Sequence, residues 1–173
     1  MDKPEKLYHG SKQLIEGPFK PILNQSSVDH IHTKPAVFAT DRADVASLFM
    51  LGVSQGLIFS IGFEQDIAYM CIWGTREEFV SKDHEGYLYT FSSEKFEKVG
   101  KEYEWQSFSE VTPIEIKKFD SVVLGMMHYG AQVYFIHDDP TFDRIVADKN
   151  NRASILKNLV SENQKENKNV RLF

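Results

Sequence analysis

Two short segments of this chain carry residue types that take part in chemistry. The first is Tyr8-His9-Gly10-Ser11, and the second is Glu102-Tyr103-Glu104-Trp105. A histidine followed by glycine and serine presents an imidazole, a hydroxyl and a main chain that a planar ligand can approach closely. Taken alone, a histidine beside a turn is more often a surface residue or a hydrogen-bonded one, so the first segment needs support from elsewhere.

The second segment predicts a pair of carboxylates. Residues two apart in a strand face the same side, so we expect Glu102 and Glu104 to point one way and Tyr103 and Trp105 the other. Two neighbouring carboxylates repel, which raises the pKa of at least one of them. Such pairs suit reactions in which positive charge develops at a sugar carbon. The alternative is a charged strand edge in solvent.

Two further segments are candidates for ligand contacts. Val37-Phe38-Ala39-Thr40 predicts a strand that leads into a helix, with Phe38 and Thr40 as the candidate contacts. Tyr87 and Tyr89 also share a strand face, and their rings are suited to the wall of a planar-ligand site. Packing in a hydrophobic core is the alternative for each aromatic residue.

The elements that position these residues predict an α+β domain. A helix with Asp41 or Thr40 as N-cap follows the second strand, and Thr75 opens a shorter helix. Residues 12–34 read as a long loop, and the last ten residues as frayed. Ile145, Ile155, Leu156 and Leu159 predict a core-packed helix over 141–164. Expected strands cover 7–9, 36–40, 57–63, 86–91, 102–107 and 109–116, and the segments 121–127 and 132–136 are two strands, or a strand and a helix start.

Composition narrows the function class. The 173 residues carry a formal net charge of −5, which disfavours generic nucleic-acid binding. The single cysteine, Cys71, lies in an apolar run and is expected to be buried and inert. The N-terminus has no apolar segment typical of a signal peptide, and no run reaches the roughly 20 apolar residues of a membrane span. We therefore expect a cytoplasmic protein with no membrane partner.

Several common site types are not predicted. No Gly-rich phosphate loop of the Walker or Rossmann pattern occurs in the sequence. His30 and His32 share a face if that segment is extended, but no third ligand follows at metal-binding spacing. We therefore expect no metal site.

Taken in order, these motifs resemble the ADP-ribosyltransferase superfamily, which includes poly(ADP-ribose) polymerases and tRNA 2′-phosphotransferases. The resemblance covers residues 7–118 and leaves 119–173 as a C-terminal extension within a single domain, 1–173. It implies a split antiparallel β core with flanking helices and a helical extension.

The resemblance also implies roles for individual residues, with NAD as substrate. His9 would hydrogen-bond a ribose hydroxyl of NAD, and Gly10 would contact the carboxamide through its backbone with help from Ser11. Glu104 would bind the 2′-hydroxyl of the nicotinamide ribose and stabilise its oxocarbenium character, while Glu102 would orient the nucleophile. The remaining expected NAD contacts are Phe38, Thr40, Tyr87 and Tyr89.

The function expected from this resemblance is an NAD-dependent ADP-ribosyltransferase or NAD glycohydrolase. A non-catalytic nucleotide- or protein-binding relative is the alternative. An RNA 2′-phosphotransferase is a second alternative, disfavoured because Phe38 stands where that branch has histidine and because the chain is acidic. The acceptor is open: a protein, a nucleic acid or a small molecule. In each case we expect His9, Ser11, Phe38 and Glu104 to converge on one cleft.

Overall fold

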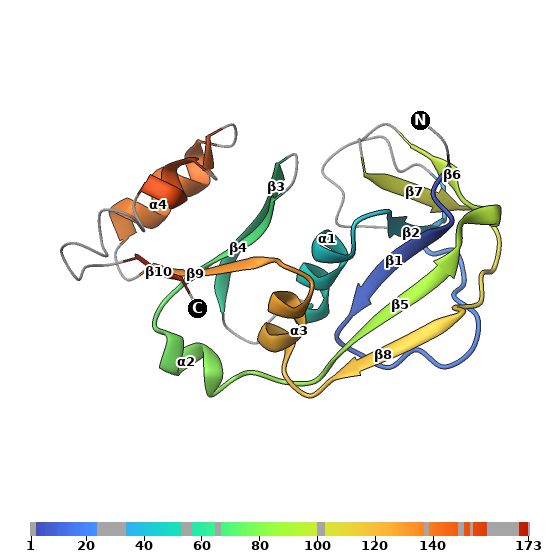
Figure 1. Cartoon of the computed structure of the whole chain (residues 1–173), viewed down its shortest axis with the longest axis horizontal. Coiled ribbons are helices and arrows are strands. Elements are labelled where there is room, and N and C mark those ends of the chain that lie inside the picture. The colour runs from blue at the N-terminus through green and yellow to red at the C-terminus, as the bar shows by residue number, and fades with distance from the viewer. Residues whose placement is uncertain are drawn as a thin grey trace.

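The chain forms an α+β structure with two β-sheets (Figure 1). The computed structural model describes residues 3–23, 34–52, 57–64, 67–99, 103–136, 139–148, 151–152, 154–158 and 170–172. Neighbouring strands run antiparallel throughout, except for one parallel pair in the smaller sheet.

The first sheet carries the two segments singled out in the sequence. Its strand order is β6-β7-β2-β1-β5-β8. The strands are β1 (Lys6–Ser11), β2 (Val37–Thr40), β5 (Gly86–Ser92), β6 (Glu97–Lys98), β7 (Glu104–Ser107) and β8 (Glu115–Phe119). Strand β1 therefore lies in the interior of the sheet, between β2 and β5.

The second sheet is built from the middle and the end of the chain, in the order β10-β9-β4-β3. Its strands are β3 (Ile58–Glu64), β4 (Ile67–Trp73), β9 (Gln132–Ile136) and β10 (Val170–Leu172), with β4 and β9 parallel. The helices are α1 (Ala43–Leu48), η1 (Phe49–Leu51), α2 (Arg76–Val80), η2 (Ser93–Lys95), α3 (Val122–His128) and α4 (Asp139–Ala147).

Helices α1 and α3 fill the space between the two sheets (Figure 1). Alternation along β4 explains how the second sheet serves two cores. Ala68, Met70 and Ile72 face α1 and α3, while Tyr69 and Cys71 face α4 on the other side. The outer face of the first sheet is covered by a separate aromatic cluster, which includes Phe19, Tyr89 and Phe91.

Most predicted elements of the first hundred residues are confirmed. Thr75 caps α2 through a capping box with Glu78, in which each side chain bonds the other residue's backbone N–H. The predicted cap of α1 is wrong. Arg42 occupies the N-cap position without a side-chain cap bond, and Thr40 Oγ1 instead accepts from Arg42 N at 3.2 Å.

Later in the chain the structure corrects three predictions. Residues 109–114 form no strand beyond a single bridge at Val111, so the strand begins only at β8. The segment 121–127 falls in a helix, α3, because Ser121 accepts from Leu124 N and starts it. Helix 141–164 is divided into α4 and a second helical segment at 154–158, although Ile145 and Leu156 are both fully buried as predicted. Leu159 lies outside the described residues.

The end of the chain is also more structured than predicted. Strand β10 falls within the ten residues expected to fray, because it pairs with β9. Residues 119–173, predicted as an extension, place α3 and β9 in the core cluster that holds α1.

Two further predictions concern the single cysteine and the membrane. Cys71 is fully buried, and burial raises the pKa of its thiol to about 12. None of the described helices is long and apolar enough to cross a membrane.

The close contact of β1 with α1 yields a stability prediction. A Cβ on Gly10 would lie 2.0 Å from the backbone oxygen of Ala46, so Gly10→Ala must push the helix away from the strand. We expect a loss of about 1–3 kcal/mol or more in the free energy of unfolding, measured by urea denaturation. Gly17→Ala is the control: its φ is +82°, nothing lies within 4 Å of the added Cβ, and the cost should be about 1 kcal/mol. Equal costs for the two variants would contradict this account of Gly10.

Candidate functional site

A pocket of about 740 Å³ lies where β1, β2, α1 and the start of β7 meet, with Phe63 of β3 also on its wall. His9, Ser11, Phe38 and Glu104 are all among its lining residues, and their contacts with a ligand stay predictions. Its aromatic wall consists of Tyr8, Phe38, Phe49, Phe63 and Tyr103. Phe49 and Phe63 are 48% and 38% exposed, so their rings are accessible from the pocket.

His9 lies at the point where two strands separate. The β1–β2 pairing runs through Tyr8 and Thr40, and beyond this pair the His9 Nδ1–H donates to the carbonyl of Phe38 at 2.8 Å. Because a carbonyl only accepts, this bond fixes the proton on Nδ1 and leaves Nε2 as an acceptor. The ring edge packs against Phe19, with centroids 5.2 Å apart.

Burial lowers the pKa of His9 below its usual value, and the hydrogen bond to Phe38 opposes this only in part. The imidazole is therefore neutral at pH 7. A neutral ring with a defined tautomer is suited to accept a hydrogen bond from a ligand hydroxyl.

The two residues after His9 have local structural tasks. Gly10 allows α1 to approach β1 closely, because the Ala46 carbonyl lies where a side chain on residue 10 would be. Ser11 Oγ donates to Gln13 O at 2.9 Å and accepts from Gln13 N at 3.2 Å, which forms a tight turn around Lys12. Both residues line the pocket, and their contacts with NAD stay predictions.

Glu104 reaches the pocket through the register of three strands. Thr40 pairs with Tyr8 on one side and with Glu104 on the other, so these three residues form a row across the sheet. Phe38 pairs with Gln106 in the next same-face row. Gln106 Nε2 donates to Glu104 Oε1 at 3.4 Å, which orients the carboxylate.

Tyr103 also lines the pocket, although alternation with Glu104 predicted the opposite direction. The prediction is wrong because β7 begins at Glu104, so Tyr103 lies in a turn where strand alternation does not apply. Trp105, inside the strand, does point away from Glu104 and into the aromatic cluster.

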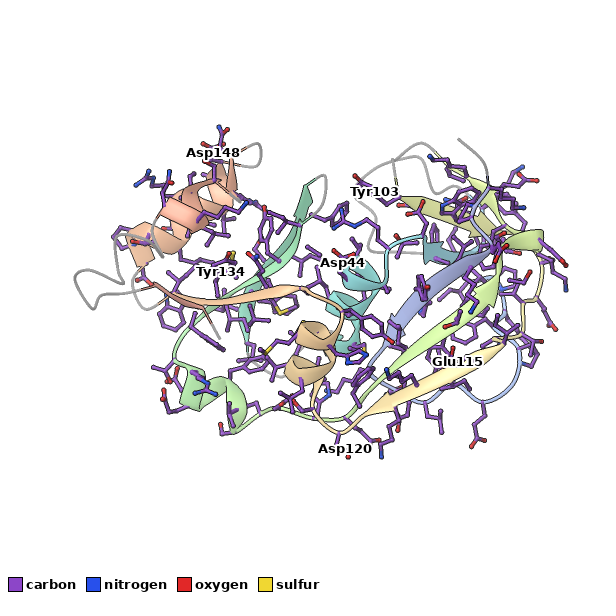
Figure 2. All side chains as sticks on the ribbon, viewed as in Figure 1. Asp44, Tyr103, Glu115, Asp120, Tyr134 and Asp148 are labelled. Atoms are coloured by element: carbon purple, nitrogen blue, oxygen red, sulfur yellow. The ribbon has the colours of Figure 1, made fainter. Side chains whose placement is uncertain are left out.

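A chain of contacts holds Tyr103 in place. The Arg42 guanidinium lies 4.9 Å from the centre of its ring, and the Phe63 ring meets it at 6.2 Å in an edge contact. Arg42 is itself held by Asp44, with Nε to Oδ1 at 3.0 Å. Tyr103 and Asp44 lie on the side of the first sheet that faces β3 (Figure 2). These contacts connect the first sheet to the second at the pocket.

Tyr87 and Tyr89 do not line the pocket, which corrects their predicted role as ligand contacts. They are 6% and 0% exposed and belong to the aromatic cluster on the outer face of the first sheet. The Tyr89 hydroxyl accepts from Ile15 N at 2.6 Å and donates to Gln13 O at 3.2 Å. Tyr89 thus holds the loop that follows β1 from behind.

Some predicted residues lie outside the described part of the chain. Glu102 is one of them, so its pairing with Glu104 and its role toward a nucleophile stay predictions. His30 and His32 are also outside it. Within the described residues, no group of three or more His, Cys, Asp or Glu could hold a metal ion.

Sequence reasoning missed Lys12, Phe49, Phe63 and Tyr103 as pocket residues. Lys12 directly follows the Tyr8–Ser11 segment, and that position was the available signal. Phe63 comes from the other sheet, and no local sequence pattern indicates such a contact.

Comparison with protein-family models, curated proteins and solved structures finds no match to this chain.

The lowered pKa of His9 yields a test by pH. In the unfolded chain this histidine takes up a proton below about pH 6.5, whereas folded His9 resists protonation. The neutral ring therefore contributes to the free energy of unfolding above pH 6.5. That stability is lost as pH falls toward the folded pKa. His9→Asn keeps a donor for Phe38 but does not titrate. We expect wild type to lose more stability than His9→Asn between pH 7.5 and 5.5 in urea denaturation. Parallel losses would show that His9 is not held neutral.

Proposed function

We propose that this chain binds NAD in the pocket and acts as an NAD-dependent ADP-ribosyltransferase or NAD glycohydrolase. One observation supports the proposal above all: the neutral His9 and the Glu104 carboxylate, from segments 95 residues apart, line the same pocket. Its volume lies within the range of about 300–1,000 Å³ typical of small-molecule and cofactor sites.

The donor and acceptor set fits this substrate. His9 Nε2 accepts from a ribose hydroxyl, and the aromatic wall offers surfaces for planar rings. Glu104, oriented by Gln106, accepts from the 2′-hydroxyl of the nicotinamide ribose. These contacts bring the N-glycosidic bond next to a carboxylate.

The reaction uses that carboxylate in the transition state. The bond between the ribose C1′ and the nicotinamide nitrogen breaks, and its electron pair leaves with nicotinamide. The positive charge that develops at C1′ and the ring oxygen is stabilised by Glu104. Water or an acceptor then adds its electron pair to C1′ and gives up a proton, for which Glu102 is the candidate base.

A nucleotide-binding protein without catalysis is the second candidate. The superfamily that the sequence resembles has a tyrosine in its His-Tyr-Glu triad, and the best match to that tyrosine here is Val37 or Phe38. Val37 is buried and Phe38, which lines the pocket, has no hydroxyl, and this favours the second candidate. Nicotinamide release separates the two candidates, because only the first produces it.

Glu104→Gln tests the catalytic role directly. The substitution keeps shape and hydrogen bonding and removes the charge that matters when C1′ becomes cationic. We expect nicotinamide release to slow by about 10²–10³-fold, while the Kd for NAD in calorimetry stays within a few-fold of wild type.

Two further variants complete the test. Glu110→Gln removes an exposed carboxylate outside the pocket lining and should leave the rate unchanged. Glu102→Gln should slow NAD hydrolysis less than Glu104→Gln. If Glu104→Gln releases nicotinamide at the wild-type rate, Glu104 is not the catalytic carboxylate.

A further inference from the structure

The pocket has opposite charges at two places, one just after β1 and the other at the start of β7. Among the described residues that line it, Lys12 is the only lysine or arginine and Glu104 the only aspartate or glutamate. Glu104 stands in the row of Tyr8 and Thr40, and Lys12 follows Tyr8 by four residues. At strand spacing this places the two backbone positions about 13 Å apart along the strand and about 10 Å apart across it.

The backbone around Lys12 is fixed from two sides. The hydroxyl of Ser11 bonds both the N–H and the carbonyl of Gln13 and so encloses Lys12 in a turn. From the core side, the Tyr89 hydroxyl holds Gln13 O and Ile15 N. A backbone that is already fixed reduces the entropy that ligand binding must overcome.

The aliphatic part of the Lys12 side chain is also held in position. It lies over Gly52, where an added Cβ would come within 3.0 Å of Lys12 Cβ and 3.3 Å of its Cδ. Gly52 has a φ of +65°, so both its conformation and this contact favour glycine. Within the described residues, no acidic side chain forms an ion pair with the Lys12 ammonium.

We infer that Lys12 binds a phosphate group of the pocket's ligand and makes the site selective for diphosphate-bearing nucleotides over nucleosides. The identity of the ligand as NAD rests on the proposed function. The anion-binding role of Lys12 rests on its own placement. The cationic end of the pocket takes the diphosphate, and the anionic end takes the ribose at which positive charge develops.

Calorimetry on the full chain tests this with three probes: ADP-ribose, nicotinamide riboside, which has no phosphate, and inorganic pyrophosphate. We expect Lys12→Met to weaken ADP-ribose binding by about 10- to 100-fold, as for the loss of a charged hydrogen bond. Pyrophosphate binding should be lost, and nicotinamide riboside binding should stay within about twofold. Lys12→Arg should retain most of the ADP-ribose affinity.

Lys82→Met is the matched control, since Lys82 is an exposed lysine outside the pocket lining. Equal ADP-ribose affinity in Lys12→Met and Lys82→Met would overturn the inference. A second measurement needs no variant: wild-type affinity for ADP-ribose should fall as NaCl rises, and a salt-independent affinity would also overturn it.

The outcomes separate this inference from the proposed function. Lys12-dependent binding of pyrophosphate and ADP-ribose without nicotinamide release from NAD would support the anion site and refute the enzyme. Nicotinamide release from NAD, together with unchanged ADP-ribose affinity in Lys12→Met, would support the enzyme and refute the anion site. If none of the three probes binds wild type, both are wrong.

Discussion

Strands β1 and β2 separate after the pair Tyr8 and Thr40, and the hydrogen bond from His9 to the Phe38 carbonyl spans the gap between them. This bond satisfies a main-chain acceptor that a continuous ladder would otherwise engage. It also sets the tautomer of the imidazole. The same bond therefore spans the opening between the strands and sets the tautomer of the ring that lies there.

The side chains that face this opening follow from register. Since Tyr8, Thr40 and Glu104 lie in one row of the sheet, a slip of one residue in either strand pair would move Glu104 to the other face. The aromatic cluster behind the sheet opposes such a slip, because it buries Leu7, Ala39 and Trp105 on the other face. Hydrophobic packing on one side thus fixes the polar arrangement on the other.

Sequence reasoning succeeded where the evidence was local. Alternation and caps predicted β1, β2, β5 and α2, and the order of the motifs predicted which residues converge. It failed where a residue's partner is distant. Tyr87 and Tyr89 alternate like wall residues, but Phe19 and Phe91 surround them in the core. The apolar segment 121–127 fits a strand or a helix equally well until Ser121 caps it as a helix. Strand β10 exists through its pairing with β9, which no pattern of its own residues indicates.

The position of α1 links the pocket to the last third of the chain. The helix lies against β1 at Gly10 and carries Val45 and Ala46 on the pocket wall, while β4, β9 and α3 pack behind it. Close-packed interiors transmit displacements, so a cavity under α3 or β9 shifts α1 and with it the wall. Phe63 adds a second route, because it reaches Tyr103 from the sheet that β9 completes. The C-terminal third therefore supports the pocket without supplying any of its described lining residues, since it packs against the helix and the strand that do.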